Sequence, residues 1–197
     1  IVADAFRDVE IPVLAVLGNH DWHVDRADQM VAVLQEGGIT VLDRSHTIVD
    51  VGGVEVGIVG TKGFMGGFPG SHLPDFGEPM LREVYAESMR EAAAIDAGLK
   101  AVAACPLRIV LLHYAPTTET LIGERETIFT FLGTDRLAPP IVDHEPDLVL
   151  HGHAHAGTFR GTLGNSPVFN VSVPVMGQDF WEFELATASK RAASAIH

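Results

Sequence analysis

The stretch 147-DLVLHGHAH-155 joins a short apolar run to a turn that carries histidines at alternate positions. Its first part, residues 148–150, has the composition of a buried strand. Its second part contains Gly152, which permits a tight turn, and imidazole is the commonest neutral nitrogen ligand for a transition metal. His153 and His155 can therefore serve one or two metal ions. We interpret the other informative segments as supplying further side chains to the same metal site.

Two further apolar segments end in side chains of the same kind. Residues 11–17 run into Asn19 and His20, and residues 107–112 run into His113. Open α/β sheets collect ligand-binding groups at the carboxyl ends of their strands. If the three strands share one sheet and one direction, these side chains meet in a single crevice. An amide oxygen with several imidazoles suits Mn, Fe, Zn, Co or Ni better than Ca or Mg.

The composition limits the possible partners. The chain has 197 residues, 47% of them hydrophobic, which suits one globular domain with a sizeable core. Acidic residues outnumber basic ones by 26 to 13, so the net charge of −13 argues against long nucleic acids. No apolar run approaches the roughly 20 residues of a membrane span. The single Cys105 fits a reducing compartment, and we predict a cytoplasmic protein.

The periodicity predicts alternating strands and helices, followed by more strands. Helices are predicted over residues 1–10, 25–36, 78–104 and 133–143, with an ambiguous, lid-like helix within 117–131. Further strands are predicted over residues 39–42, 47–51, 54–60, 159–163, 167–173 and 180–185. Gly52-Gly53 predicts a tight hairpin. The alternation predicts a layered α/β fold with a mixed sheet, as one domain over residues 1–186 with a frayed tail over 187–197.

One long loop could have a functional role. Residues 61–79 are rich in glycine and proline and carry Phe64 and Phe68. Loops of this length are often lids or binding edges, and the alternative is a loop that folds back on the core. Trp22, next to the histidine motif, either forms a wall of the site or packs in the interior. Substrate-binding residues are not identified from the sequence.

The order of three motifs resembles the later motifs of the calcineurin-like metallophosphoesterases. They are residues 18–21 (GNHD), His113 at a strand end, and residues 152–155 (GHAH). The resemblance implies a layered αββα sandwich with mixed sheets. It also implies two divalent transition metals, with Mn, Fe or Zn preferred. In that family the metals hold a hydroxide that attacks the phosphorus of a phosphoester, and stabilise the attacking and leaving oxygens.

The same resemblance assigns roles to single residues. It implies that Asn19, His113 and His153 bind one metal and that His155 binds the other. It implies that His20 is catalytic and protonates or stabilises the leaving oxygen. The implied activity is hydrolysis of a small phosphodiester or phosphomonoester. His151 is not required by the family motif, and a structural or supporting role is favoured.

The chain departs from the family at its beginning. The family opens with strands that end in Asp-x-His and Gly-Asp-x-x-Asp, and neither motif occurs in this sequence. Those motifs would supply the bridging carboxylate and most ligands of one metal. The apolar helical face that starts at Ile1 has no capping residue. We therefore expect a sandwich without its first strands, completed by an N-terminal segment or by an oligomer, because open strand edges pair with other chains.

Two other functions compete with this interpretation. A zinc hydrolase of the metallo-β-lactamase type would show a His-x-His-x-Asp-His run, which is absent. A non-catalytic metal-binding or scaffold remnant of the same fold stays open, because part of the ligand set is missing. The expected partner is a small phosphorylated substrate, with no long nucleic acid and no membrane.

Overall fold

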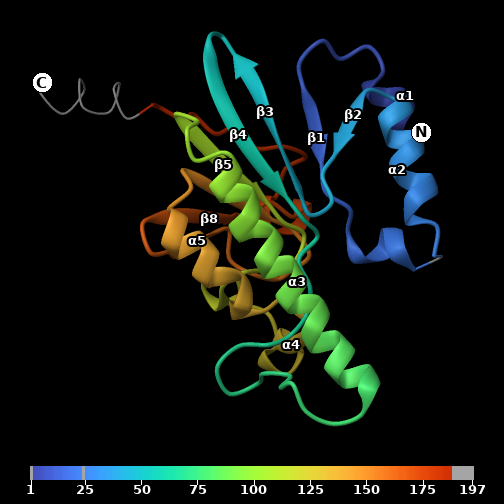
Figure 1. The fold of residues 1–197 in the computed structure, drawn as a ribbon, viewed down its shortest axis with the longest axis vertical. Helices are drawn as coiled ribbons and strands as arrows, with labels where there is room; N and C mark the ends of the chain where they lie inside the picture. The colour runs from blue at the N-terminus through green and yellow to red at the C-terminus, as the bar shows by residue number, and fades with distance from the viewer. Residues whose placement is uncertain (1, 24, 188–197) are drawn as a thin grey trace, which may run out of the picture.

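The computed structural model describes residues 2–23 and 25–187, and its ribbon is shown in Figure 1. The helices are α1 (Val2–Phe6), α2 (Ala27–Glu36), α3 (Pro79–Ala101), α4 (Phe129–Leu132), α5 (Ala138–His144) and α6 (Val173–Met176). The strands are β1 (Val13–Ala15), β2 (Ile39–Val41), β3 (Ser45–Val51), β4 (Val54–Gly60), β5 (Leu107–Leu111), β6 (Leu148–His151), β7 (Arg160–Leu163) and β8 (Ser166–Asn170). Short 3-10 turns are η1 (Asn19–Trp22), η2 (Thr118–Leu121), η3 (Glu126–Ile128) and η4 (Asp135–Leu137). Residues 188–197 of the predicted tail lie outside the described residues.

The strands form two sheets. The larger has six strands in the order β3-β4-β5-β6-β8-β7, in which β4, β5, β6 and β8 are parallel and both edge strands pair antiparallel. β1 and β2 form a separate parallel pair. The assumption that the three strands ending in motif residues share one sheet is therefore wrong for β1. β1 lies in the smaller sheet, which packs on the larger sheet that contains β5 and β6.

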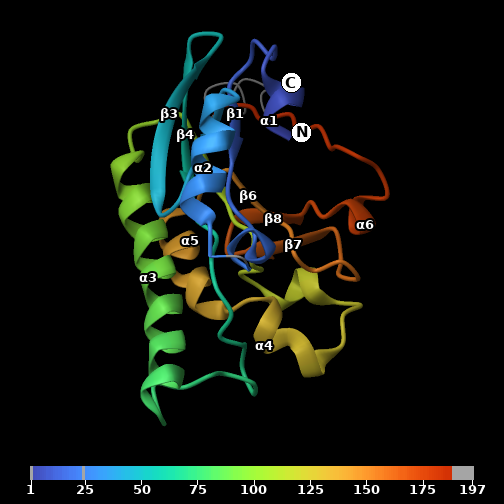
Figure 2. The same ribbon diagram turned by 90° about the vertical axis from the view of Figure 1, so that its right-hand side faces the viewer.

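The sheets and helices stack as a sandwich. On one face of the large sheet, Val110 packs with Ile95 of α3 and Leu99 of α3, and α5 joins the same cluster. On the other face, Ile58 packs with Leu14 of β1. α2 covers the outer side of the small sheet. Figure 1 shows β1, β2, α1 and α2 together on the right, and Figure 2, in which that side faces the viewer, shows α3 along the left edge of the molecule. The predicted layered α/β sandwich with a mixed sheet is confirmed.

Local sequence explains several boundaries. Gly52 and Gly53 have φ of 62° and 84°, and they join β3 to β4 in the register Val51↔Val54. A two-residue turn with positive φ at both positions matches the twist of the flanking strands. α2 ends before Gly37, as the glycine pair at that point predicts.

The predicted strand over residues 180–185 is wrong. The Trp181 ring lies 4.4 Å from the Phe159 ring, and the Phe183 ring lies 4.8 Å from the Phe169 ring, between centroids. This segment packs its rings on β8 and on the residue before β7, without joining the ladder of the six-stranded sheet. Alternating apolar residues therefore mark a packed face here, not a hydrogen-bonded strand.

Other segments differ in extent. The helix predicted over residues 1–10 is described only as Val2–Phe6, and the region 117–131 holds η2, η3 and the start of α4 in place of one lid-like helix. α6 was not predicted. Among the described residues, no helix is both long and apolar enough to cross a membrane.

We expect Gly98→Ala to destabilise the protein by about 1–2 kcal/mol, although alanine favours helices by about 1 kcal/mol over glycine. A Cβ at Gly98 would lie 2.5 Å from Cγ1 of Val59, so α3 would be pushed off β4. Urea unfolding measures the change. Ala97→Gly on the exposed face of α3 is the control and should cost about 1 kcal/mol. The effect of Gly98→Ala should shrink in a Val59→Ala background, and a stabilised Gly98→Ala would contradict the packing.

Candidate functional site

Three donor atoms from distant parts of the chain converge. Nε2 of His113 lies 2.8 Å from Oδ1 of Asn19 and 3.1 Å from Nδ1 of His153. Two ligand atoms bound at right angles to one metal at 2.0–2.1 Å lie about 3 Å apart. The three side chains are half-buried. The spacing is therefore that of donors able to share one ion.

Parallel pairing of β5 with β6 positions the two imidazoles. Leu111 pairs with Leu150, so both strands end at the same edge of the sheet. The turns that follow stay joined, since the N–H of Gly152 donates to the carbonyl of His113 at 3.2 Å. His153 then continues from that turn toward the His113 ring. Asn19 reaches the same point from η1, which follows β1 on the face of the large sheet.

The backbone of His153 is held in an unusual conformation. Its φ is 69°, and the N–H of Ala154 donates to the carbonyl of Gly152 at 2.8 Å, which closes a γ-turn around it. Such turns with positive φ are rare and strained, by about 1–3 kcal/mol for a non-glycine residue. Asn170 Nδ2 and Ser172 Oγ both donate to the carbonyl of Ala154, at 2.7 and 3.0 Å. These two bonds hold the strained turn in place.

The η1 turn is fixed by Asp21 and Gly18. Oδ2 of Asp21 accepts a hydrogen bond from the N–H of Gly18 at 2.7 Å, which closes the turn that carries Asn19. The Gly18 backbone lies against the His113 ring, because a Cβ there would lie 2.9 Å from its Cε1. Asp21 therefore acts as a local cap of this turn.

Burial keeps the two imidazoles neutral. It lowers the pKa of His113 to about 3, with the neighbouring His153 as the second cause. Burial also lowers the pKa of His153, against the hydrogen bond that its ring donates to the carbonyl of Phe131. A neutral imidazole retains the lone pair that a metal needs. The site therefore presents donors that do not have to lose a proton first at neutral pH.

The remaining predicted residues lie around this cluster. His20 is exposed and its ring stacks on that of His23 at 4.5 Å. Its charge contributes to the lowered pKa of both clustered histidines, which puts it within electrostatic reach. His155 is exposed, and its charge is felt at His153. His151 is fully buried and contacts Thr120 Oγ1 at 2.7 Å and the carbonyl of the following residue at 2.8 Å.

The cluster has a limited donor set. Across residues 2–23 and 25–187, no group of three or more His, Cys, Asp or Glu side chains is placed to hold a metal ion. Asn19, His113 and His153 contribute two imidazoles and one amide. In the same described ranges, neither imidazole is hydrogen-bonded to a carboxylate.

Several residues at the site were missed from the sequence. The carbonyl of Lys62 accepts hydrogen bonds from the N–H groups of His113 and Tyr114, both at 3.0 Å. The Tyr114 ring lies 4.6 Å from the His153 ring. Asn170 ends β8 as a polar residue, and that pattern could have identified it. Lys62 and Tyr114 carry no comparable pattern, because their roles depend on how β4 and β5 pair.

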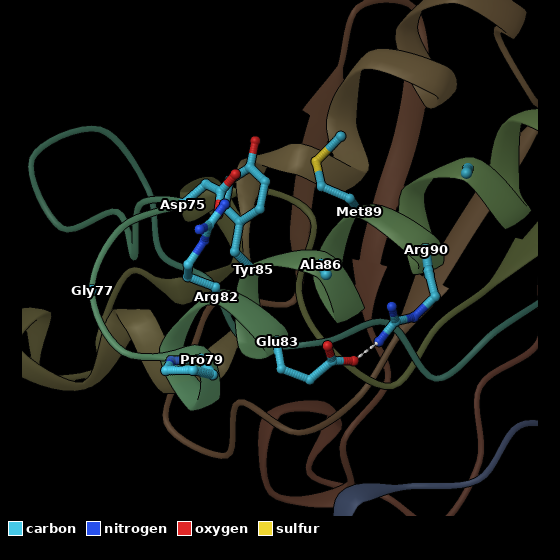
Figure 3. A pocket seen from close by; sticks show the side chains of 10 residues that line it. Asp75, Gly77, Pro79, Arg82, Glu83, Tyr85, Ala86, Met89 and Arg90 are labelled. Carbon is cyan, nitrogen blue, oxygen red and sulfur yellow. Dashed lines mark hydrogen bonds and ion pairs between the residues drawn. The ribbon is translucent and has the colours of Figure 1, made fainter.

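A cavity of about 860 Å³ lies against the first half of α3, away from this cluster (Figure 3). Asp75, Arg82, Tyr85 and Met89 are among its walls. None of its lining residues belongs to the predicted site. Size alone therefore does not locate the candidate chemistry in this protein.

Comparisons with known proteins support the fold. No protein-family model matches the chain, and no curated protein matches it. Among solved structures, phosphopantetheinyl hydrolase from Mycobacterium tuberculosis is similar, with a TM-score of 0.58 and 17% identity over 83% of this chain and 70% of that one. A structure named "Putative 5'-Nucleotidase from Staphylococcus aureus" gives a TM-score of 0.54 and 14% identity over 86% of this chain.

The chain spans 34% of that nucleotidase chain, about a third of its length. At such identities the likeness shows the fold alone.

We expect Asn170→Ala to lower the free energy of unfolding by about 1–3 kcal/mol, because a buried amide that holds the Ala154 carbonyl is lost. Asn165→Ala is the matched control: its side chain is exposed and donates a hydrogen bond to Oε1 of the exposed Glu145, so the change should be within about 0.5 kcal/mol. Urea denaturation curves compare the two. Equal effects would show that Asn170 does not hold the turn.

Proposed function

We propose that this chain is a metal-dependent phosphoester hydrolase that acts on a small phosphodiester or phosphomonoester. One observation carries the proposal: Oδ1 of Asn19 and Nδ1 of His153 both lie within about 3 Å of Nε2 of His113. The sandwich fold and the names of its structural neighbours support the reaction class.

The donor set fits a divalent transition metal. Asn19, His113 and His153 would hold one ion through an amide oxygen and two neutral imidazoles, a mixture that suits Mn, Fe or Zn. His155 would contribute to a second ion. When bound, such ions supply Lewis-acid stabilisation of charge and lower the pKa of water.

The chain's own residues would bind and orient the substrate and move a proton. His20 stands exposed on η1, next to the Asn19 donor, so its ring can approach the leaving oxygen of a substrate held at the cluster. It would donate a proton there as the bond to phosphorus breaks. The γ-turn at His153 and the Asp21 cap would keep the donors from rearranging.

A second ion would need a carboxylate that comes from elsewhere. Within the described residues the cluster has no carboxylate bonded to it. We propose that a complementing N-terminal segment or another chain supplies it, together with the remaining ligands of the second ion. The second candidate function, a non-catalytic metal-binding scaffold, is favoured by the same limited donor set.

We expect His113→Ala or His153→Ala to weaken Mn²⁺ or Zn²⁺ binding by at least about 10-fold, because each removes one of few donors. Isothermal titration calorimetry measures the affinity. His46→Ala, an exposed histidine on β3, is the matched control and should bind metal like the parent protein. Unchanged affinity in both site variants would contradict the proposed ligands.

The Asp21 cap gives a subtler test of the same site. We expect Asp21→Ala to weaken metal binding by about 10-fold, because the turn that carries Asn19 loses the side-chain acceptor that closes it. Asp50→Ala removes a similar acceptor, which bonds the N–H of Gly53 at 3.0 Å, in the remote β3–β4 hairpin. Calorimetric titration with metal should give a lower affinity for the Asp21 variant than for the Asp50 variant. Equal metal affinities would contradict a role of Asp21 in positioning Asn19.

We expect His20→Ala to lower kcat for bis-p-nitrophenyl phosphate by about 10²–10⁴-fold, with metal affinity retained, because a proton donor is lost. Initial rates with added Mn²⁺ measure this, in a preparation that contains any complementing segment. His23→Ala removes the ring stacked on His20 and is the control. Absence of turnover in a metal-loaded parent protein would favour the scaffold function instead.

A further inference from the structure

A buried ammonium group lies next to the candidate site. Lys62 is only 8% exposed and follows β4. Its Nζ lies 4.5 Å from the ring centroid of Phe64, 5.3 Å from that of Trp22 and 5.8 Å from that of Tyr114. In the part of the chain that the structure describes, this Nζ forms no hydrogen bond and no ion pair. Aromatic faces stabilise a cation, but they leave its N–H donors without acceptors.

The ammonium group borders a cavity of about 480 Å³ between the η1 turn and α3. Trp22, Phe64, Met80 and Val84 form most of its apolar wall. This volume is within the range of small-molecule sites, which combine apolar walls with a few polar groups. Lys62 is such a polar group.

The other charged side chains at the rim already have partners. Arg90 pairs with both Glu83 and Glu87, and Figure 3 shows the first pair as a dashed line. Glu87 also pairs with Arg44. Among the described residues that line this cavity, Lys62 is therefore the charged group without an ion-pair partner. Burial lowers the pKa of Lys62, and the carboxylates of Glu91 and Glu87 act against this at longer range. Because Arg90 and Arg44 already pair with the lining carboxylates, Lys62 is the cation whose N–H donors are left for a ligand.

The cavity adjoins the donor cluster through two elements. Trp22 is the last residue of η1, the turn that begins with Asn19. Tyr114 lies between the two regions, since its ring contacts Lys62 Nζ on one side and lies 4.6 Å from the His153 ring on another. A substrate with its phosphoryl group at the cluster could thus extend its organic part past Trp22.

We propose that this cavity receives the organic part of the substrate and that Lys62 selects an aromatic or apolar group that carries one carboxylate. The assignment rests on the proposed phosphoesterase function. One carboxylate matches the single unpaired ammonium, whereas a second phosphoryl group would bring two negative charges against one cation. The aromatic wall favours a planar ring, which can stack on Trp22 or Phe64.

Binding to the metal-free protein tests the cavity without relying on activity. We expect 2-naphthoate to bind more tightly than 2-naphthylmethanol, by calorimetry in the presence of EDTA. Lys62→Met should weaken naphthoate binding by about 10-fold or more, because a charge-assisted hydrogen bond is lost, and should leave the alcohol unaffected. Lys62→Arg keeps the charge and should retain most of the affinity. Lys100→Met, an exposed lysine on α3, is the matched control.

A second variant tests the position of the ligand. Val84→Trp should fill the cavity and abolish naphthoate binding, whereas Ala97→Trp on the exposed face of α3 should not. Equal affinity for naphthoate in the parent protein, Lys62→Met and Val84→Trp would overturn the assignment. So would equal binding of the acid and the alcohol.

A kinetic comparison separates this proposal from the proposed function. The metal-loaded protein should hydrolyse 4-carboxyphenyl phosphate with a kcat/KM about 10-fold above that for phenyl phosphate, and Lys62→Met should remove the preference. Hydrolysis without any preference would overturn the role of Lys62 and leave the phosphoesterase function intact. Carboxylate binding without hydrolysis of any phosphoester would overturn that function and with it the assignment of a substrate.

Discussion

The parallel pairing of β5 with β6 is the constraint on which the candidate site depends. Because both strands end at one edge of the sheet, His113 and His153 leave it side by side. The backbone bond from Gly152 to the His113 carbonyl extends this alignment beyond the strands. β1 then approaches from the second sheet, and hydrophobic contact of Leu14 with the large sheet fixes how far Asn19 reaches. The donor atoms meet because two packed layers end at the same place.

Holding these polar groups together opposes stability in several ways. His113 and His153 are partly desolvated, and the backbone of His153 adopts a strained conformation. Neighbouring side chains offset this locally. Asn170 and Ser172 donate hydrogen bonds to the carbonyl of Ala154, next to His153, and Asp21 closes the η1 turn that carries Asn19. Strain concentrated in this way, on a rigid scaffold, is typical of sites where side chains must be held in position.

α3 connects the core to the surroundings of the site. Its second half packs Ile95 and Leu99 on the large sheet, and Gly98 allows close approach to β4. Its first half extends beyond the sheet and forms one wall of the cavity that Lys62 borders. Packing of the helix against β4 therefore also decides the shape of the space next to the metal-ligand candidates. The same element contributes to stability and to the selection proposed for the organic group.

The sequence by itself determined the layered α/β class, the glycine hairpin between β3 and β4, and the three candidate donor side chains that the structure brings together, Asn19, His113 and His153. These features follow from local sequence patterns, namely apolar runs that form strands, paired glycines, and histidines at the ends of strands. Only the tertiary structure decided that β1 lies in a separate sheet, that residues 180–185 pack without pairing, and that Lys62 and Tyr114 border the site. Each of these depends on contacts between residues far apart in the chain. Hydrophobic periodicity predicts that one face of an element is buried, but it does not identify the element that packs against that face.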